Sequence, residues 1–132
     1  MIDVLATAIN ARYDSASGAA LRALTTGMYP EEAPQGAIGI YITYSFIITD
    51  SEWTFDTTFD GPLVQFSLWS SDDSPLSVME AGTALVSLYK DVLLTVTGWT
   101  SVRADKVGER LLDDPNDKGF QYIVEMKYKL GT

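Results

Sequence analysis

The apolar and polar residues of the chain show two periodicities, and the helical periodicity predicts two helices. Apolar residues recur at helical spacing over residues 2–24, apart from a run of small residues that ends at Gly18. We therefore expect a first helix that is interrupted near Gly18. A second helix is expected from Ser74 to about Lys90, because a serine followed by Pro75 is typical of a helix N-terminus.

The second periodicity is a twofold alternation of apolar and polar residues, which is the pattern of a strand with one buried face. It is clear over residues 38–48, 63–69 and 120–130, and weaker over 93–97 and 101–112. The connector 29–36 holds two prolines, which lack a backbone donor, so we expect it to be irregular. Residues 113–119 are turn formers and predict a tight turn before the last strand.

The predicted order of elements is helix, strand, strand, helix, strand, strand, strand. This order favours an α+β fold in which two helices pack on one face of a mostly antiparallel β-sheet. The 132 residues suffice for one hydrophobic core, and the sequence holds no internal repeat or linker. We therefore expect a single domain over residues 1–132.

The composition excludes most of the usual catalytic groups. The chain has no histidine and no cysteine, so a Ser-His-Asp triad, a thiol nucleophile and a Cys/His zinc site are all excluded. Neither G-x-G-x-x-G nor G-K-[ST] occurs, so no phosphate-binding loop is predicted. No apolar run is long enough to cross a membrane, and no signal peptide is evident. We expect no enzyme activity, cofactor, metal or membrane association.

The acidic excess lies in the middle of the chain. Residues 31–91 hold ten of the 18 acidic residues and a single basic residue, Lys90, so this segment carries the whole net charge of −9. Proteins that grip nucleic acid need clustered Lys and Arg, which disfavours DNA binding. The segment is either a solvated surface that aids solubility or a surface past which DNA moves without adhering.

Two groups of carboxylates are candidates for chemistry. Asp114 begins a run with the spacing of a calcium loop, but Lys118 stands where a ligand is needed and the flanking segments are predicted strands. Asp56 and Asp60 could pair as acid and base in a glycosidase, although nothing in the sequence fixes their separation. A small carboxylate-dependent enzyme or ligand-binding domain therefore stays open as an alternative function.

Three aromatic residues interrupt the polar segment between two predicted strands, namely Trp53, Phe55 and Phe59. Aromatic side chains are enriched at the centres of protein interfaces. These three either fold back onto their own domain or contact another subunit.

Several local strings resemble the tail-completion, or tail-terminator, family of long-tailed bacteriophages and related prophages. Residues 28–36 followed by 40–44 are similar to the family's connector from the first helix into the first strand. Residues 63–70 resemble its second strand, and the turn at 111–114 leading into 119–130 resembles its closing hairpin. The likeness spans most of the chain and rests on the pattern and order of elements.

The resemblance implies a structural virion protein that caps the tail tube, ends its polymerisation and joins tail to head as a ring of six copies. Its partners would be further copies of itself, the tail tube protein and the head-tail connector protein. It would lie at the head-tail junction of the virion, after assembly in the host cytoplasm, and double-stranded DNA would pass without specific binding. A head-completion or neck component of the same virion region is the alternative.

The residue-level candidates follow from charge and from aromatics in polar surroundings. A ring needs two different complementary patches on each subunit, and strand 120–130 is expected to offer an edge for one of them. The interface candidates are Trp53, Phe55, Phe59, Lys127 and Lys129. The candidates for a DNA-repelling lumen are Asp50, Glu52, Asp56 and Asp60. Changing these four acids to lysine is expected to disturb DNA retention in assembled particles, and unchanged retention and ejection would contradict the lumen assignment.

Overall fold

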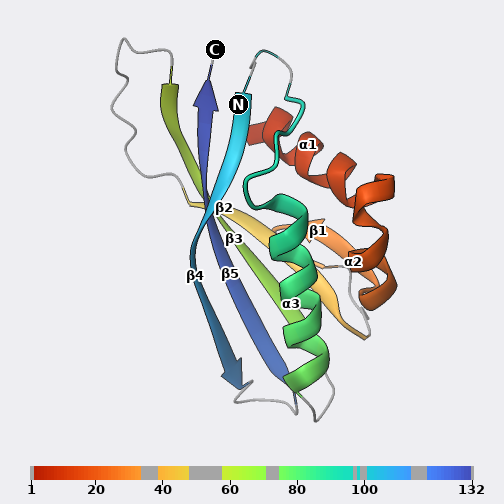
Figure 1. Cartoon of the computed structure of the whole chain (residues 1–132). Coiled ribbons are helices and arrows are strands. Elements are labelled where there is room, and N and C mark those ends of the chain that lie inside the picture. Colours follow the sequence, from red (N-terminus) through yellow and green to blue (C-terminus); the bar gives the residue numbers. More distant parts are fainter. Residues whose placement is uncertain are drawn as a thin grey trace.

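The computed structural model describes residues 2–33, 39–47, 58–70, 75–96, 98, 101–113 and 119–131. Its helices are α1 (Ile2–Asp14), a short 3-10 helix (Ala16–Gly18), α2 (Ala19–Leu24) and α3 (Pro75–Tyr89). Its strands are β1 (Gly27–Pro30), β2 (Tyr41–Ile47), β3 (Thr58–Ser70), β4 (Ser101–Asp113) and β5 (Phe120–Gly131). Figure 1 shows the helices gathered on one side of a twisted sheet. The predicted α+β class is confirmed as a mixed fold with three α-helices and five strands.

The five strands form one sheet in the order β1-β2-β3-β5-β4. β1 pairs with β2 in parallel, whereas the other three neighbouring pairs are antiparallel. The sheet is therefore mostly antiparallel, as predicted. In β4 the register shifts between Lys106 and Gly108, which places a bulge at Val107.

The predicted interruption of the first helix is present, and an arginine side chain holds it. Arg22 donates hydrogen bonds to the carbonyl oxygen of Tyr13 at the end of α1 and to that of Ser15, which also accepts from the amide of Gly18 at 3.0 Å. Arg12 donates in the same way from Nε to the carbonyl oxygen of Leu88 near the end of α3, at 3.2 Å. Both arginines of the first thirty residues thus place positive charge at helix C-termini, where the helix dipole favours it.

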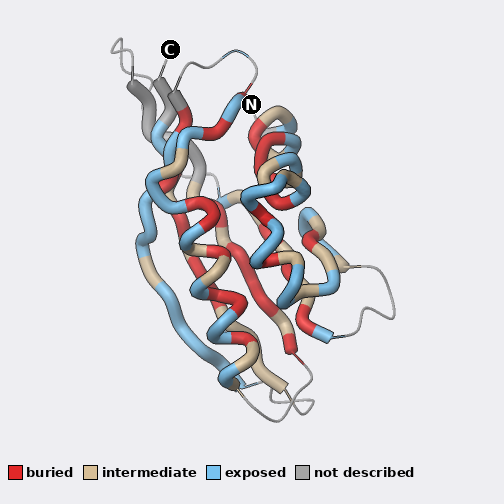
Figure 2. The backbone as a smooth tube through the Cα atoms, turned by 45° about the vertical axis from the view of Figure 1, so that its right-hand side comes forward, coloured by how far each residue is buried: buried red, intermediate tan, exposed pale blue. Residues whose placement is uncertain are grey.

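The core lies between the helices and one face of the sheet. Apolar residues at helical spacing on α1 and α3 meet the buried residues of β2, β3 and β5 in one cluster, which includes Leu5, Ile9, Val78, Leu85, Ile42, Val64, Leu68, Val124 and Met126. At its centre the ring of Phe66 stacks on Tyr89 with centroids 5.3 Å apart and lies 5.9 Å from Tyr44. Figure 2 shows the buried residues along the surfaces where helices and sheet meet.

The structure contains one strand that the sequence pattern did not predict. Gly27–Pro30 forms β1, which overlaps the first two residues of the segment 29–36 expected to be an irregular connector, and it pairs in parallel with residues 41–44. Four residues that end in a proline are too few to show an alternation. The strand exists because β2 offers a partner, and its edge position tolerates Pro30.

The strand expected over residues 93–97 is wrong for residues 93–96, which the structure describes without a strand. Leu94 and Val96 are buried while Leu93 is exposed, so the alternation itself is real. The segment lies along the edge of β4 and makes a single hydrogen bond there, from the amide of Leu94 to the carbonyl of Val102 at 2.9 Å. Its burial pattern therefore comes from contact with the sheet and not from a ladder.

The expectation that strand 120–130 offers an edge is also wrong. β5 lies between β3 and β4 and pairs with both along its length. Polar residues alternate with core residues along β5 because, within the described residues, one face of the sheet packs on the helices and the other face does not. The edges of the sheet are β1 and β4.

Candidate assembly surfaces and a helix-side pocket

The predicted site residues fall into two groups. Five of them lie outside the described residues, between β2 and β3 in the sequence, and stay predictions, namely Asp50, Glu52, Trp53, Phe55 and Asp56. Phe59 and Asp60 lie on β3, where the register sets them opposite Leu130 and Lys129 of β5. Asp60, predicted for the lumen, and Lys129, predicted for an interface, are therefore cross-strand neighbours. Lys127 lies opposite Asp105 of β4.

The face of the sheet away from the core is polar and carries both predicted lysines. Its side chains bind across strands. Trp69 donates from Nε1 to Thr43 Oγ1 at 3.0 Å, and Gln121 donates from Nε2 to Ser67 Oγ at 3.2 Å. Within the described ranges no helix covers this face (Figure 1). Trp69 is half-buried on this face, and its indole N–H is bound within the sheet.

Charge is distributed unevenly between the two edges of the sheet. β4 and β5 carry five basic residues together with four acidic ones: Arg103, Lys106, Arg110, Lys127, Lys129, Asp105, Glu109, Asp113 and Glu125. At the opposite edge, exposed Glu31 and Glu32 follow β1 without a basic residue beside them in the sequence. Glu31 has a φ of 63°, and its amide donates to the carbonyl of Tyr44 at 2.8 Å. This backbone turn fixes acidic residues at the β1 edge.

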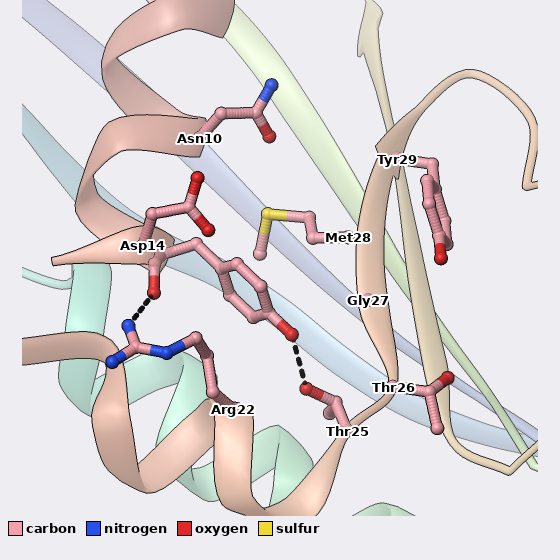
Figure 3. A pocket seen from close by; sticks show the side chains of 9 residues that line it. Asn10, Asp14, Arg22, Thr25, Thr26, Gly27, Met28 and Tyr29 are labelled. Carbon is pink, nitrogen blue, oxygen red and sulfur yellow. Dashed lines mark hydrogen bonds between the residues drawn. The ribbon is translucent and has the colours of Figure 1, made fainter.

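A pocket of about 560 Å³ lies between α1, α2 and β1 (Figure 3). It is lined by Asn10, Tyr13, Asp14, Arg22, Thr25, Thr26, Gly27, Met28 and Tyr29. The Tyr13 and Thr25 hydroxyls are hydrogen-bonded at 2.8 Å, and Arg22 is bound to the end of α1. Thr26 donates from Oγ1 to the carbonyl of Ile40 at 3.2 Å. Four of the polar side chains that line the pocket are thus hydrogen-bonded within the chain, and these bonds tie α1 to α2 and to the start of β1.

A half-buried tyrosine lies where α3 crosses β5. The ring of Tyr122 packs directly against Gly82, where a Cβ would overlap it. Burial, and then the hydrogen bond and negative charge of Glu109, raise the pKa of Tyr122 to about 12. The shift reflects the close contact of this side chain with α3 and with Glu109.

Two general features of the described part of the chain bear on its chemistry. Among those residues no three acidic side chains come together in a way that could hold a metal ion. None of the helices there is both long and apolar enough to cross a membrane.

The fold is similar to that of a virion protein. A chain of the virion of a native gene transfer agent (GTA) particle matches with a TM-score of 0.72 at 15% sequence identity, over 96% of this chain and 93% of its own. A second solved protein matches with a TM-score of 0.69 at 14% identity, over 100% of this chain and 96% of its own. No protein-family model and no curated protein matches the sequence. The likeness therefore extends over the whole fold.

The sequence did not reveal the pocket or the edge position of β4. The pocket depends on how the α1–α2 break is folded, for which the only sequence signal was the small-residue run before Gly18. Whether β4 is an edge strand depends on which strands β5 lies between, and the alternation of residues along a strand does not show which strands are its neighbours.

Proposed function

We propose that this chain is a structural virion protein that caps a phage-type tail tube, ends its polymerisation and joins the tail to the head as a ring of six copies. The observation that carries the proposal is the match of the whole fold to a chain of the gene transfer agent virion, with 96% of one chain and 93% of the other aligned. The finer role at the end of the tail is supported by the resemblance to the tail-terminator family of residues 28–36 with 40–44, of residues 63–70, and of the turn at 111–114 leading into 119–130.

The charge at the two sheet edges supports a head-to-tail contact between copies. A ring is closed by contacts between two different patches of each subunit. Exposed Glu31 and Glu32 beside β1 offer a negative patch, and Arg103 on the opposite edge strand β4, with Lys129 next to it on β5, offers a positive one. We propose that these patches meet between neighbouring subunits, since complementary charge sets register and partner choice. The role is non-catalytic in this proposal, consistent with a chain that has no histidine or cysteine.

Ring formation can be tested with the purified full chain and a charge-reversed variant. We expect rings of uniform diameter in negative-stain images, with the tail tube protein added where needed. Glu31→Lys combined with Glu32→Lys is expected to abolish the rings, because both patches then carry the same sign. Glu80→Lys on the exposed side of α3 makes a comparable charge change away from both patches and is expected to leave the rings intact.

The proposal is overturned if the native chain stays monomeric at every concentration, even with tube protein present. Rings that survive reversal at residues 31 and 32 would keep the virion role and contradict the charge contact.

A further inference from the structure

The outer edge of β4 is covered in its first half and open in its second. The carbonyls of Val102 and Ala104 accept hydrogen bonds from the amides of Leu94 and Asp91, both at 2.9 Å. From residue 105 to 113, no strand of the described part of the chain pairs with this edge. Figure 2 shows exposed residues along this half of β4. An open strand edge of this length is a template for pairing with another strand.

In one antiparallel register, the charged residues of this open half of β4 match opposite charges on the same segment of a second copy. The outward backbone groups of Val102 and Ala104, continued along the strand and past the bulge, place Lys106 and Glu109 outward as well. If Lys106 of one copy lies opposite Glu109 of another, then Asp105 lies opposite Arg110. Each pair joins opposite charges, and each occurs twice in a two-fold arrangement.

The faces of the sheet agree with this register. Lys106 and Glu109 lie opposite Met126 and Val124 of β5, which are core residues, so both are on the helix side. Asp105 and Gly108 lie opposite Lys127 and Glu125, and Arg110 lies opposite Ile123, so all three are on the open face. Directly opposed residues in an antiparallel pair must share a face, and both pairs of opposite charge do.

Exposed apolar residues gather at the same contact. Of the eight large apolar side chains exposed in the described residues, four lie at or beside this edge: Leu93, Val107, Leu111 and Leu112. Residues 91–94 already occupy the edge at residues 102–104, so the pairing ends at residue 110. Leu111 and Leu112 of one copy then lie beside residues 91–94 of the other, where Leu93 is 53% exposed. Val107, which is 59% exposed, lies opposite Gly108 of the second copy, and a Cβ at Gly108 would meet nothing within 4 Å.

We propose that two copies of this chain pair edge to edge through residues 105–110 of β4, antiparallel and two-fold, with Lys106 opposite Glu109 and Asp105 opposite Arg110. The partner is a second copy of this chain, because the complementary surface is the same segment. A two-fold contact closes at two copies and uses other residues than a head-to-tail ring. The pair is therefore the form of the free chain, independent of the proposed ring.

The test uses two variants, each of which has the same sign of charge at positions 106 and 109. Lys106→Glu makes positions 106 and 109 both acidic, and Glu109→Lys makes both basic. Each variant alone opposes like charges at two places, so we expect self-association to weaken roughly tenfold or more. Mixed together, the acidic and the basic variant oppose unlike charges at both places, so the mixture is expected to form dimers. Sedimentation velocity on the full chain measures all three samples.

The mixing step separates this contact from effects within one chain. Lys106 and Glu109 also form an ion pair in the same copy at 3.6 Å, which both variants break equally. Damage from that loss would not be repaired by mixing. Glu80→Lys, on the exposed side of α3 and not at the β4 edge, makes the same charge change as Glu109→Lys and is the control, which is expected to dimerise like the native chain.

Dimers in the mixture and not in either variant alone would support the pair. The inference is overturned if the native chain, without tube protein, stays monomeric at every concentration up to its solubility limit. It is also overturned if the mixture of the two variants behaves like the separate variants. Rings formed by a native chain that lacks the β4 pair would overturn this inference alone, whereas a β4 pair in a native chain that never forms rings would overturn the proposed function alone.

Discussion

Replacing Gly18 with alanine is expected to lower the free energy of unfolding by about 3 kcal/mol, at the upper end of the usual cost of overpacking. A Cβ at Gly18 would overlap the carbonyl oxygen of Tyr13 and lie 2.9 Å from the carbonyl oxygen of Arg12. These are backbone atoms that cannot rotate away. Relief of the clash must open the α1–α2 break, where Arg22 binds the same carbonyl of Tyr13. Denaturant unfolding followed by circular dichroism measures the loss.

The matched control for this prediction is Gly108→Ala. Both changes add one methyl group to a glycine whose φ is not positive, but the space around Gly108 is open to beyond 4 Å. We expect Gly108→Ala to change the unfolding free energy by less than about 1 kcal/mol, since the added methyl meets no atom. Equal destabilisation by both substitutions would show that the close approach at Gly18 is not the cause.

The elements that the sequence predicted are those whose burial follows a single face. β2, β3 and β5 bury alternate residues against the helices, and α3 buries Val78, Leu85 and Tyr89 at helical spacing. Where burial has another origin the pattern misleads. Residues 93–96 alternate because they lie along the β4 edge, and β1 is too short to alternate although it completes the sheet.

The assembly surfaces were less predictable than the fold, because they depend on which strands are neighbours. The sequence located the acidic excess in residues 31–91 and singled out Lys127 and Lys129. It could not show that β5 inserts between β3 and β4, which removes β5 from the edge and exposes residues 105–113 instead. The self-complementary charges of β4 become meaningful only once that edge is known.

Raising the pH above 10 is expected to destabilise the fold steeply, because its buried tyrosines resist ionisation. Burial raises the pKa of Tyr44, Tyr89 and Tyr128 above the usual 10.0. The unfolded chain ionises these groups from pH 10 upward while the folded chain does not. Their stabilising effect is therefore complete below pH 10 and is lost as the pH rises. Each such tyrosine costs up to about 1.4 kcal/mol per pH unit in this range.

Because each unfolded tyrosine is already half ionised at pH 10, Tyr89 and Tyr128 alone remove about 2 kcal/mol between pH 10 and pH 11, a large share of the stability of an ordinary domain. The full slope is reached only above about pH 11. Denaturant unfolding at intervals between pH 8 and pH 12, in the range where tyrosine titrates, measures this dependence. A free energy of unfolding that stays level from pH 10 to 12 would contradict the prediction, because the buried hydroxyls would then titrate alike in both states.

Two tyrosine-to-phenylalanine substitutions should separate the effect of ionisation from the effect of hydrogen bonding. Tyr89 donates its hydroxyl to the carbonyl of Ile9 at 2.7 Å, whereas the buried hydroxyl of Tyr128 has no hydrogen-bond partner among the described residues. Near pH 7 we expect Tyr89→Phe to lose about 1 kcal/mol, and Tyr128→Phe to lose nothing or to gain about 1 kcal/mol. Above pH 10 both variants are expected to lose stability less steeply than the native chain, because each variant has one fewer tyrosine proton to release on unfolding. The same chemical change therefore has opposite signs at neutral pH and the same sign in alkali, a combination that a general change in packing at either site would not produce.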